Sequence, residues 1–292
     1  MKYKAYNLSL NKDANAFEQW DSGLLQNLLA GKLWKPKNWL DFNVSHCTGL
    51  PKVDVALVAI PARHHKGKEL LINEQLKRID RVVLFLLGDE EADFDVSQID
   101  HPNISIYIQN PHIGKHDKYN KIGTGYPKHF KAPKDITKTT DISFAGQITH
   151  QRREELSDVL LNIGDCTVNI VRTKGFTQGL DHAEYAKLMS ETRIAPCPSG
   201  AVIPDSFRLF EALESMALVI ADTKTPAGEI LPYWDWLFNG EPAFAQVSDW
   251  GRLYGLVPEL LADYPNNLHK QTAWWIKYKR DLVTKVIEDL NA

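Results

Sequence analysis

CPSGAVIPDSFRLFEALESMALVIAD, residues 197–222, stands out from the rest of the chain. A loop containing Pro and Gly leads into a helix expected over 206–216, and the apolar run 218–222 is typical of a buried strand. Arg208 falls in the first turn of that helix, where a cation faces the positive end of the helix dipole. Glu211 follows three residues later on the same face. A cation at this position is unfavourable unless an anion meets it.

The N-terminus of this helix is therefore expected to form an anion site, because its free N–H groups and its dipole attract negative charge. A diphosphate would bind the N–H groups, the Ser206 hydroxyl and the Arg208 guanidinium. Glu211 would then accept hydrogen bonds from paired hydroxyls, as on a ribose. The alternative is a capped amphipathic helix with a surface Arg–Glu pair, which contributes little to stability.

Strand-like and helix-like segments alternate along the rest of the chain. The expected strands are 2–10, 53–60, 81–88, 104–109, 141–147, 166–173, 193–197 and 218–222. The expected helices are 14–31, 67–79, 152–163, 182–191, 206–216 and 270–290. The runs 53–60 and 81–88 are almost continuously apolar, which is typical of strands buried on both faces of a parallel sheet. The alternation pauses at 111–138 and then restarts, so the sequence predicts two Rossmann-like α/β domains with a cleft between them.

The composition is that of a globular chain of 292 residues, 43% of them hydrophobic, which is enough for two domains. No apolar run is long enough for a membrane span, and the N-terminus has no apolar signal segment. The three cysteines are widely spaced, which suits a reducing cytoplasm and does not match a C-x-x-C metal site. We therefore expect a cytoplasmic protein with no membrane span.

The net charge of −3 is divided unequally along the chain. Residues 1–139 carry 20 Lys or Arg and 16 Asp or Glu, whereas residues 140–292 carry 14 and 21. Residues 111–138 hold seven lysines and three histidines against two aspartates. Three aromatic residues lie among them: Tyr119, Tyr126 and Phe130. This segment is either a solvated loop near a domain boundary or a surface that faces a polyanion.

Common nucleotide, hydrolase and metalloprotease motifs are absent from the sequence: G-x-G-x-x-G, G-x-x-x-x-G-K-[ST], H-E-x-x-H and G-x-S-x-G do not occur. Residues 197–222 instead closely resemble the C-terminal signature of exostosin-like glycosyltransferases, Cys-Pro-x-Gly, a short gap, then Ser-x-Arg-x-x-Glu-Ala-Leu and an apolar strand. Residues 182–197 resemble the helix and strand that precede this signature. LFLLGDEEADF, HPNISIYIQNP and IGTGYP are more loosely similar to N-terminal segments of soluble bacterial or phage members of the group.

The resemblance implies a GT-B fold, with two Rossmann-like domains facing a cleft. It implies an acceptor-binding domain and linker over 1–139, a nucleotide-sugar-binding domain over 140–275 and a helix over 276–292 that crosses back to the first domain. The implied activity is transfer of a hexosyl or pentosyl group from a nucleotide sugar, expected to be a UDP-sugar, to a hydroxyl. Neither a cofactor nor a metal is expected. Ser215–Met216 stands where many members have a small Gly–Cys pair, a departure that bears on the shape of the donor site.

Carried over to this chain, the resemblance implies that Ser206 and Arg208 hold the donor diphosphate and that Glu211 holds the ribose. Arg152 and Arg153 resemble the basic residues that reach the diphosphate from the first loop of the second domain. The alternative for these two arginines is a pair of solvent-facing charges at the start of a helix.

Transfer to a hydroxyl is commonly assisted by a base that removes its proton. Asp89 and Glu90 come directly after the strand 81–88 and are the candidates, with a solvated acidic turn as the alternative. His46 and His64–His65 are further candidate bases, although a lone histidine is more often structural. A retaining mechanism needs no dedicated base.

The sequence leaves the acceptor open between a glycan or small molecule and double-stranded DNA with a hydroxymethylated base such as 5-hydroxymethylcytosine. The basic stretch 63–68 and the lysines of 115–134 supply the charge that DNA binding needs, and the base would have to leave the stack. The candidate acceptor-binding residues are His64, His65, Lys66 and Lys115. A non-catalytic module that binds sugar nucleotides is a third possibility.

Overall fold

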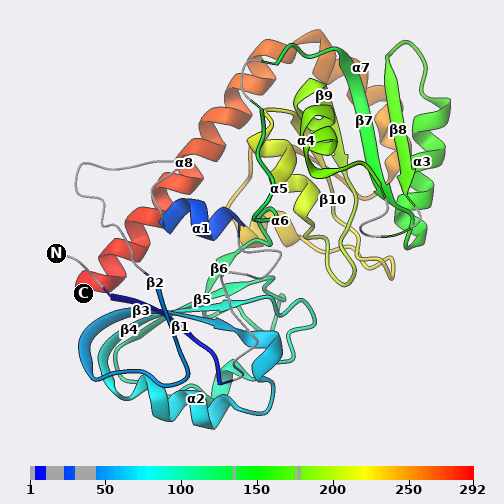
Figure 1. Cartoon of the computed structure of the whole chain (residues 1–292). Coiled ribbons are helices and arrows are strands. Elements are labelled where there is room, and N and C mark those ends of the chain that lie inside the picture. Colours follow the sequence, from blue (N-terminus) through cyan, green and yellow to red (C-terminus); the bar gives the residue numbers. More distant parts are fainter. Residues whose placement is uncertain (1–3, 11–22, 30–43, 134–135, 174, 176–178) are drawn as a thin grey trace. The chain divides into compact units, whose positions relative to one another are not determined.

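A computed structural model describes residues 4–10, 23–29, 44–133, 136–173, 175 and 179–292. The chain divides into two compact units (Figure 1). The first comprises Met1–Lys128 and Lys277–Ala292, and the second comprises His129–Ile276. The helix expected over 14–31 lies mostly outside the described residues, and its described part is α1 (Gly23–Leu29).

The first unit contains a parallel sheet whose described strands have the order β2-β1-β3-β4-β5-β6. The strands are β1 (Lys4–Leu8), β2 (Val44–Cys47), β3 (Val53–Pro61), β4 (Ile79–Leu87), β5 (Ile104–Gln109) and β6 (Asn120–Ile122). The 3-10 helix η3 (Ala62–His65) and α2 (Glu69–Leu76) connect β3 to β4, and η4 (Val96–Gln98) lies between β4 and β5. The parallel sheet predicted from the apolar runs is confirmed.

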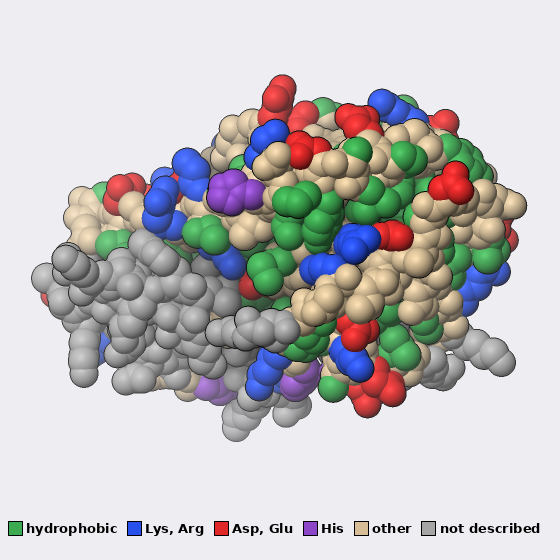
Figure 2. Space-filling model, turned by 90° about the horizontal axis from the view of Figure 1, so that it is seen from above, with side chains coloured by type: hydrophobic (Ala, Val, Ile, Leu, Met, Phe, Trp, Pro, Cys, Tyr) green, Lys and Arg blue, Asp and Glu red, His purple; other side chains and the backbone are tan. Residues whose placement is uncertain are grey.

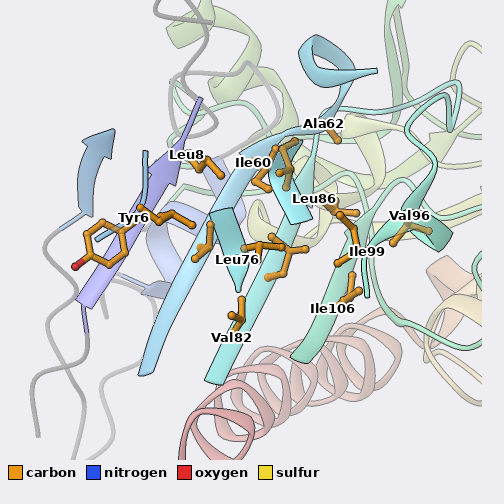
Figure 3. Close-up of a cluster of buried hydrophobic side chains, with 14 of the residues drawn as sticks. Tyr6, Leu8, Ile60, Ala62, Leu76, Val82, Leu86, Val96, Ile99 and Ile106 are labelled. Atoms are coloured by element: carbon orange, nitrogen blue, oxygen red, sulfur yellow. The ribbon is translucent and has the colours of Figure 1, made fainter. Parts of the chain in front are cut away.

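Side chains of β3 and β4 alternate between two cores because successive residues of a strand point to opposite faces. On one face, Ile60 and Val82 pack with Leu76 of α2 (Figure 3). On the other face, Leu57 and Phe85 pack with residues of the C-terminal helix α8 (Tyr264–Asn291). Two side chains of α8, Val286 and Leu290, are buried in this second core.

The second unit also contains a parallel sheet, and its described strands have the order β11-β10-β9-β7-β8. They are β7 (Thr140–Gln147), β8 (Val168–Thr173), β9 (Thr192–Cys197), β10 (Leu218–Asp222) and β11 (Ala245–Val247). The helices are α3 (Gln151–Asn162), α4 (His182–Glu191), α5 (Phe207–Glu214), α6 (Tyr233–Leu237) and α7 (Leu253–Ala262), with η5 (Trp250–Arg252) before α7. The first part of α8 completes the unit.

Helix α5 is fixed against its sheet by an apolar face, on which Leu209, Phe210 and Leu213 are buried. A hydrogen bond from the segment before β7 holds its C-terminus. The amino group of Lys138 donates to the Ser215 carbonyl at 2.8 Å, and burial lowers the pKa of Lys138 to about 8. The helix predicted over 206–216 is therefore present, and its N-terminus lies at the carboxyl end of β9.

The short strands β2, β6 and β11 are not among the strands that the sequence predicts. β6 lies inside the segment 111–138, which we expected to be irregular, and it pairs with β5 at the edge of the first sheet. Two aromatic residues of that segment, Tyr126 and Phe130, are buried rather than displayed on a surface. Their burial removes part of the basis for a polyanion-binding face.

Candidate functional site

The second sheet has a topological switch point beside β7. From β7 the chain passes to β8 on one side and then returns to β9 on the other side. Ligands of open parallel sheets bind at such a point, outside the carboxyl ends of the strands. Here the loops that follow β7 and β9 lie side by side, because Arg153 Nη1 donates to the Gln147 carbonyl at 3.1 Å and Arg153 Nη2 to the Ser199 carbonyl at 3.1 Å.

The N-terminus of α5 opens at this edge without a side-chain cap. Ser206 is the N-cap residue, but its hydroxyl donates to the Pro198 carbonyl at 3.1 Å and does not cap the helix. The first-turn N–H groups of α5 are thus left without the usual side-chain acceptor. The prediction that the Ser206 hydroxyl binds a diphosphate would require this hydroxyl to rotate.

Arg208 is held against the end of β7 by three features. Its guanidinium lies over the ring of Phe144, 4.7 Å from the ring centroid, and its Nη2 donates to the Ala145 carbonyl. A Cβ at Gly146 would overlap Nη2, so the absence of a side chain there makes room for the guanidinium. Nε is buried and has no hydrogen-bond partner among the described residues. The cation is thus buried, with one of its donors unused.

Glu211 lies one turn further along α5 and is also buried. The hydroxyl of Tyr185 on α4 donates to Glu211 Oε2 at 2.6 Å. Burial raises the pKa of Glu211 to about 7, and the Tyr185 hydrogen bond and the Arg208 charge oppose that rise. The two residues singled out in the sequence therefore lie together as a buried cation and a nearby carboxylate.

Arg152 takes a different place from the one that the resemblance implies. Its Nε and Nη2 donate to the two carboxylate oxygens of Asp222 at 3.0 and 2.8 Å, and its Nη1 pairs with Glu155. The guanidinium also lies 5.4 Å from the ring centroid of Trp250. A diphosphate could reach Arg152 only by breaking this buried ion pair, so the geometry gives it a structural role. Arg153 is the arginine that reaches the loops at the switch point.

In the first unit, Asp89 holds its own loop in place. Its Oδ1 accepts from Asp93 N at 3.0 Å and its Oδ2 accepts from Phe94 N at 2.9 Å, and the side chain is buried. A role as base would require Asp89 to give up these bonds. Glu90 is only partly buried, and its carbonyl accepts from His112 Nε2 at 2.8 Å.

His64 and His65, which we predicted to contact the acceptor, differ in burial. His64 is exposed, but the ring of His65 is fully buried. His65 Nδ1 lies 2.9 Å from the Pro61 carbonyl, and Leu10 N donates to its Nε2 at 2.9 Å. Burial lowers the pKa of His65, so the ring is neutral and joins two loops. A contact between His65 and an acceptor would require the ring to give up these bonds and leave the core.

The basic loop after β3 pairs with the acidic loop after β4. Lys66 lies 2.8 Å from Asp93, and Arg63 lies 3.7 Å from Glu91. Lys115, from the loop after β5, donates to a backbone carbonyl of the same acidic loop. On the face drawn in Figure 2, basic side chains of the described residues are interspersed with acidic ones. Two of the charges that the sequence offers for a polyanion surface, Arg63 and Lys66, are thus paired with carboxylates.

The sequence did not single out several residues that shape the switch-point edge. Tyr185 reads as an ordinary helix residue, and Phe144 as a core residue. His150 Nε2 lies 3.2 Å from the Ser199 carbonyl, while His150 Nδ1 and Ser199 Oγ are buried without a partner among the described residues. The signal that could have found them is position, because each lies in β7 itself or in a segment directly before or after β7 or β9.

Among the described residues, no helix is long and apolar enough to cross a membrane.

No protein-family model matches the sequence, and no curated protein matches it. Among solved structures, the chain is similar to AviGT4, a glycosyltransferase involved in avilamycin A biosynthesis, at 12% identity, over 99% of this chain and 98% of that one, with a TM-score of 0.49. It is also similar to Anabaena Alr3699/HepE in complex with UDP, at 12% identity, over 100% of this chain and 98% of that one, with a TM-score of 0.39.

Proposed function

We propose that the chain is a glycosyltransferase that takes its sugar from a nucleotide-sugar donor bound at the switch-point edge of the second sheet. The observation that carries the proposal is the place of Arg208, a buried guanidinium with an unused donor beside a helix N-terminus that has no side-chain cap. A diphosphate supplies the acceptor oxygens that both features lack. Arg153, between the two loops, supplies a second positive charge.

Glu211 gives the site its nucleoside specificity in this proposal. The Tyr185 hydroxyl occupies Oε2, and Oε1 has no hydrogen-bond partner among the described residues. An ionised carboxylate in such a place accepts hydrogen bonds from the two neighbouring hydroxyls of a ribose. A diphosphate next to a ribose is the common part of nucleotide-sugar donors. The exostosin-like signature supports the same roles for Ser206, Arg208 and Glu211, and a UDP-sugar is the donor that we propose.

In this proposal the first unit binds the acceptor. The acceptor that we propose is a hydroxyl of a glycan or a small molecule. Hydroxymethylated DNA is less well supported, since Lys66 and Arg63 pair with carboxylates. Asp89 and Glu90 stay the proposed bases, and Asp89 would have to release the two backbone hydrogen bonds that its oxygens accept.

Replacing Arg208 by methionine (Arg208→Met) should weaken binding of UDP-glucose by about 1.5–3 kcal/mol, from the loss of charge-assisted hydrogen bonds. Methionine keeps apolar contact with Phe144, so the fold should survive. Calorimetry of UDP-glucose binding measures the effect. The matched control is Arg172→Met on β8, whose side chain is half exposed. Equal affinities of a folded Arg208→Met variant and the wild type would exclude the diphosphate role.

Turnover distinguishes an enzyme from a binding module. We expect slow release of free sugar from the nucleotide sugar when no acceptor is present, measured by chromatography of the nucleotide products. Tight donor binding without any release, across a panel of UDP-sugars and simple glycan acceptors, would indicate a non-catalytic sugar-nucleotide-binding module.

The wild type should not shift duplex DNA in a gel at about 50 mM salt, because Lys66 would first have to leave Asp93, and Lys115 the Ala92 carbonyl, before either met a phosphate. A salt-sensitive shift would reverse this expectation. In that case, replacing Lys66, Lys68, Lys115 and Lys118 together should reduce the slope of log K against log salt by about 0.9 for each lost phosphate contact.

A further inference from the structure

Tyr185 is the one side chain that donates a hydrogen bond to Glu211 among the described residues, and it comes from a different helix. The donor–acceptor distance of 2.6 Å is in the range of a hydrogen bond from a hydroxyl to an ionised carboxylate. The N-terminus of helix α4, which carries Tyr185, is stabilised by a capping box of Asp181 and Glu184. The ring of Tyr185 also packs edge-on against Phe130, 6.3 Å between centroids. The capped start of α4 and the contact with Phe130 thus fix the position of the Tyr185 side chain.

We propose that Tyr185 is a positioning residue for nucleotide binding, which fixes Glu211 Oε2 so that Oε1 is presented to the ribose hydroxyls. The inference rests on the proposed function and adds to it a residue that never touches the donor. A hydroxyl can donate to an ionised carboxylate but gains little from a protonated one. The Tyr185 bond therefore favours the form of Glu211 that accepts hydrogen bonds from a diol.

The charged and titratable groups around Glu211 make this role measurable. Arg208, on the same helix, favours the carboxylate, whereas burial opposes it. Cys197 on β9 stays a neutral thiol, since burial raises its pKa far above neutrality. The pKa of Tyr185 is also raised by burial, so its hydroxyl keeps its proton. At the same edge, burial lowers the pKa of His150. Glu211, with a pKa of about 7, is then the group of this set that changes charge near neutrality.

Removing the hydroxyl in Tyr185→Phe should raise the pKa of Glu211 by about one unit, since a hydrogen bond to the charged form lowers an acid's pKa. Binding that needs the carboxylate should then be about tenfold weaker than in the wild type at pH 6.0 and nearly equal to it at pH 8.5. A defect in packing alone would weaken binding by the same factor at both pH values.

The experiment is calorimetric titration of wild type and Tyr185→Phe with UDP at pH 6.0, 7.0 and 8.5. The ratio of the two dissociation constants at each pH cancels the ionisation of the UDP phosphate. Tyr254→Phe is the matched control, because Tyr254 is half exposed on α7 of the same unit. Phe130→Leu, which loosens the ring of Tyr185 but keeps its hydroxyl, should show the same pH pattern with a smaller amplitude.

The outcomes separate the inference from the proposed function. If the wild type binds no UDP at any pH, the proposed function fails. If the wild type binds UDP and the ratio for Tyr185→Phe is constant from pH 6.0 to 8.5, the positioning role is overturned while donor binding stands. If Tyr185→Phe does not fold, the ratio of dissociation constants for Phe130→Leu and wild type decides between the same two outcomes. A ratio that falls towards one as the pH rises, with none of this change in Tyr254→Phe, supports the inference.

Discussion

Asp222→Asn should lower the free energy of unfolding by about 3 kcal/mol or more, because it leaves the guanidinium of Arg152 buried without its principal counter-ion. Only 4% of the Arg152 side chain and none of the Asp222 side chain is exposed, and two hydrogen bonds join them. Asparagine has the same shape as aspartate, so the change removes the charge and leaves the packing. Loss of the charge also weakens the bond that Asp222 Oδ1 accepts from Lys224 N.

Urea unfolding at pH 7 followed by circular dichroism measures this loss. Glu155→Gln is the matched control, since Glu155 pairs with the same guanidinium but is more than a third exposed. It should cost less than about 1 kcal/mol, as expected for an ion pair at the surface. If Asp222→Asn cost no more than Glu155→Gln, the Arg152–Asp222 pair would not be an anchor of the second unit, and Arg152 would again be a candidate for donor binding.

Glu211→Gln should make the protein more stable above neutral pH while it weakens nucleotide binding. The pKa of Glu211 is raised by burial from 4.5 to about 7. The unfolded chain therefore releases this proton at lower pH than the folded chain, and stability falls as the pH rises from about 4.5 to 7. Glutamine has no proton to lose and its carbonyl can still accept the Tyr185 bond. The gain should be absent near pH 4 and reach about 3 kcal/mol at pH 8.

Thermal unfolding at pH 4.5 and pH 8 tests the first half of this prediction, and calorimetry with UDP and UDP-glucose tests the second. Both ligands should lose affinity alike, because both carry the ribose. A variant that gained stability at pH 8 and bound both ligands as well as the wild type would show that the carboxylate is a buried charge with no part in binding. A residue that lowers the stability of the fold while it strengthens ligand binding, as we expect for Glu211, is common at functional sites.

The long buried strands and the helix α5 could be predicted from the sequence because their signals are local. A continuous apolar run in β3 or β4 indicates a buried parallel strand without reference to the rest of the chain. The strands β2, β6 and β11, of three or four residues each, are too short to show a period. They are held by pairing with a longer neighbour, which the sequence does not reveal.

The candidate site was predicted only where its residues follow one another in the chain. Arg208 and Glu211 lie three positions apart on one helix, so their shared face could be read directly. The sequence does not reveal the partner of Arg152, because Asp222 is 70 positions away at the end of another strand. The basic and acidic loops after β3 and β4 looked like separate functional features. Since these strands are neighbours in a parallel sheet, their loops meet, and opposite charges there neutralise each other.

The burial of Val286 and Leu290 in the core of the first unit has a consequence for the order of events during synthesis. The strands β1 to β6 emerge from the ribosome long before residues 277–292, which cover one face of their sheet. Until then, Leu57 and Phe85 lack part of the surface that buries them. The second unit has a sheet assembled from one continuous stretch of chain. The half of the protein that is made first is therefore the half that finishes folding last.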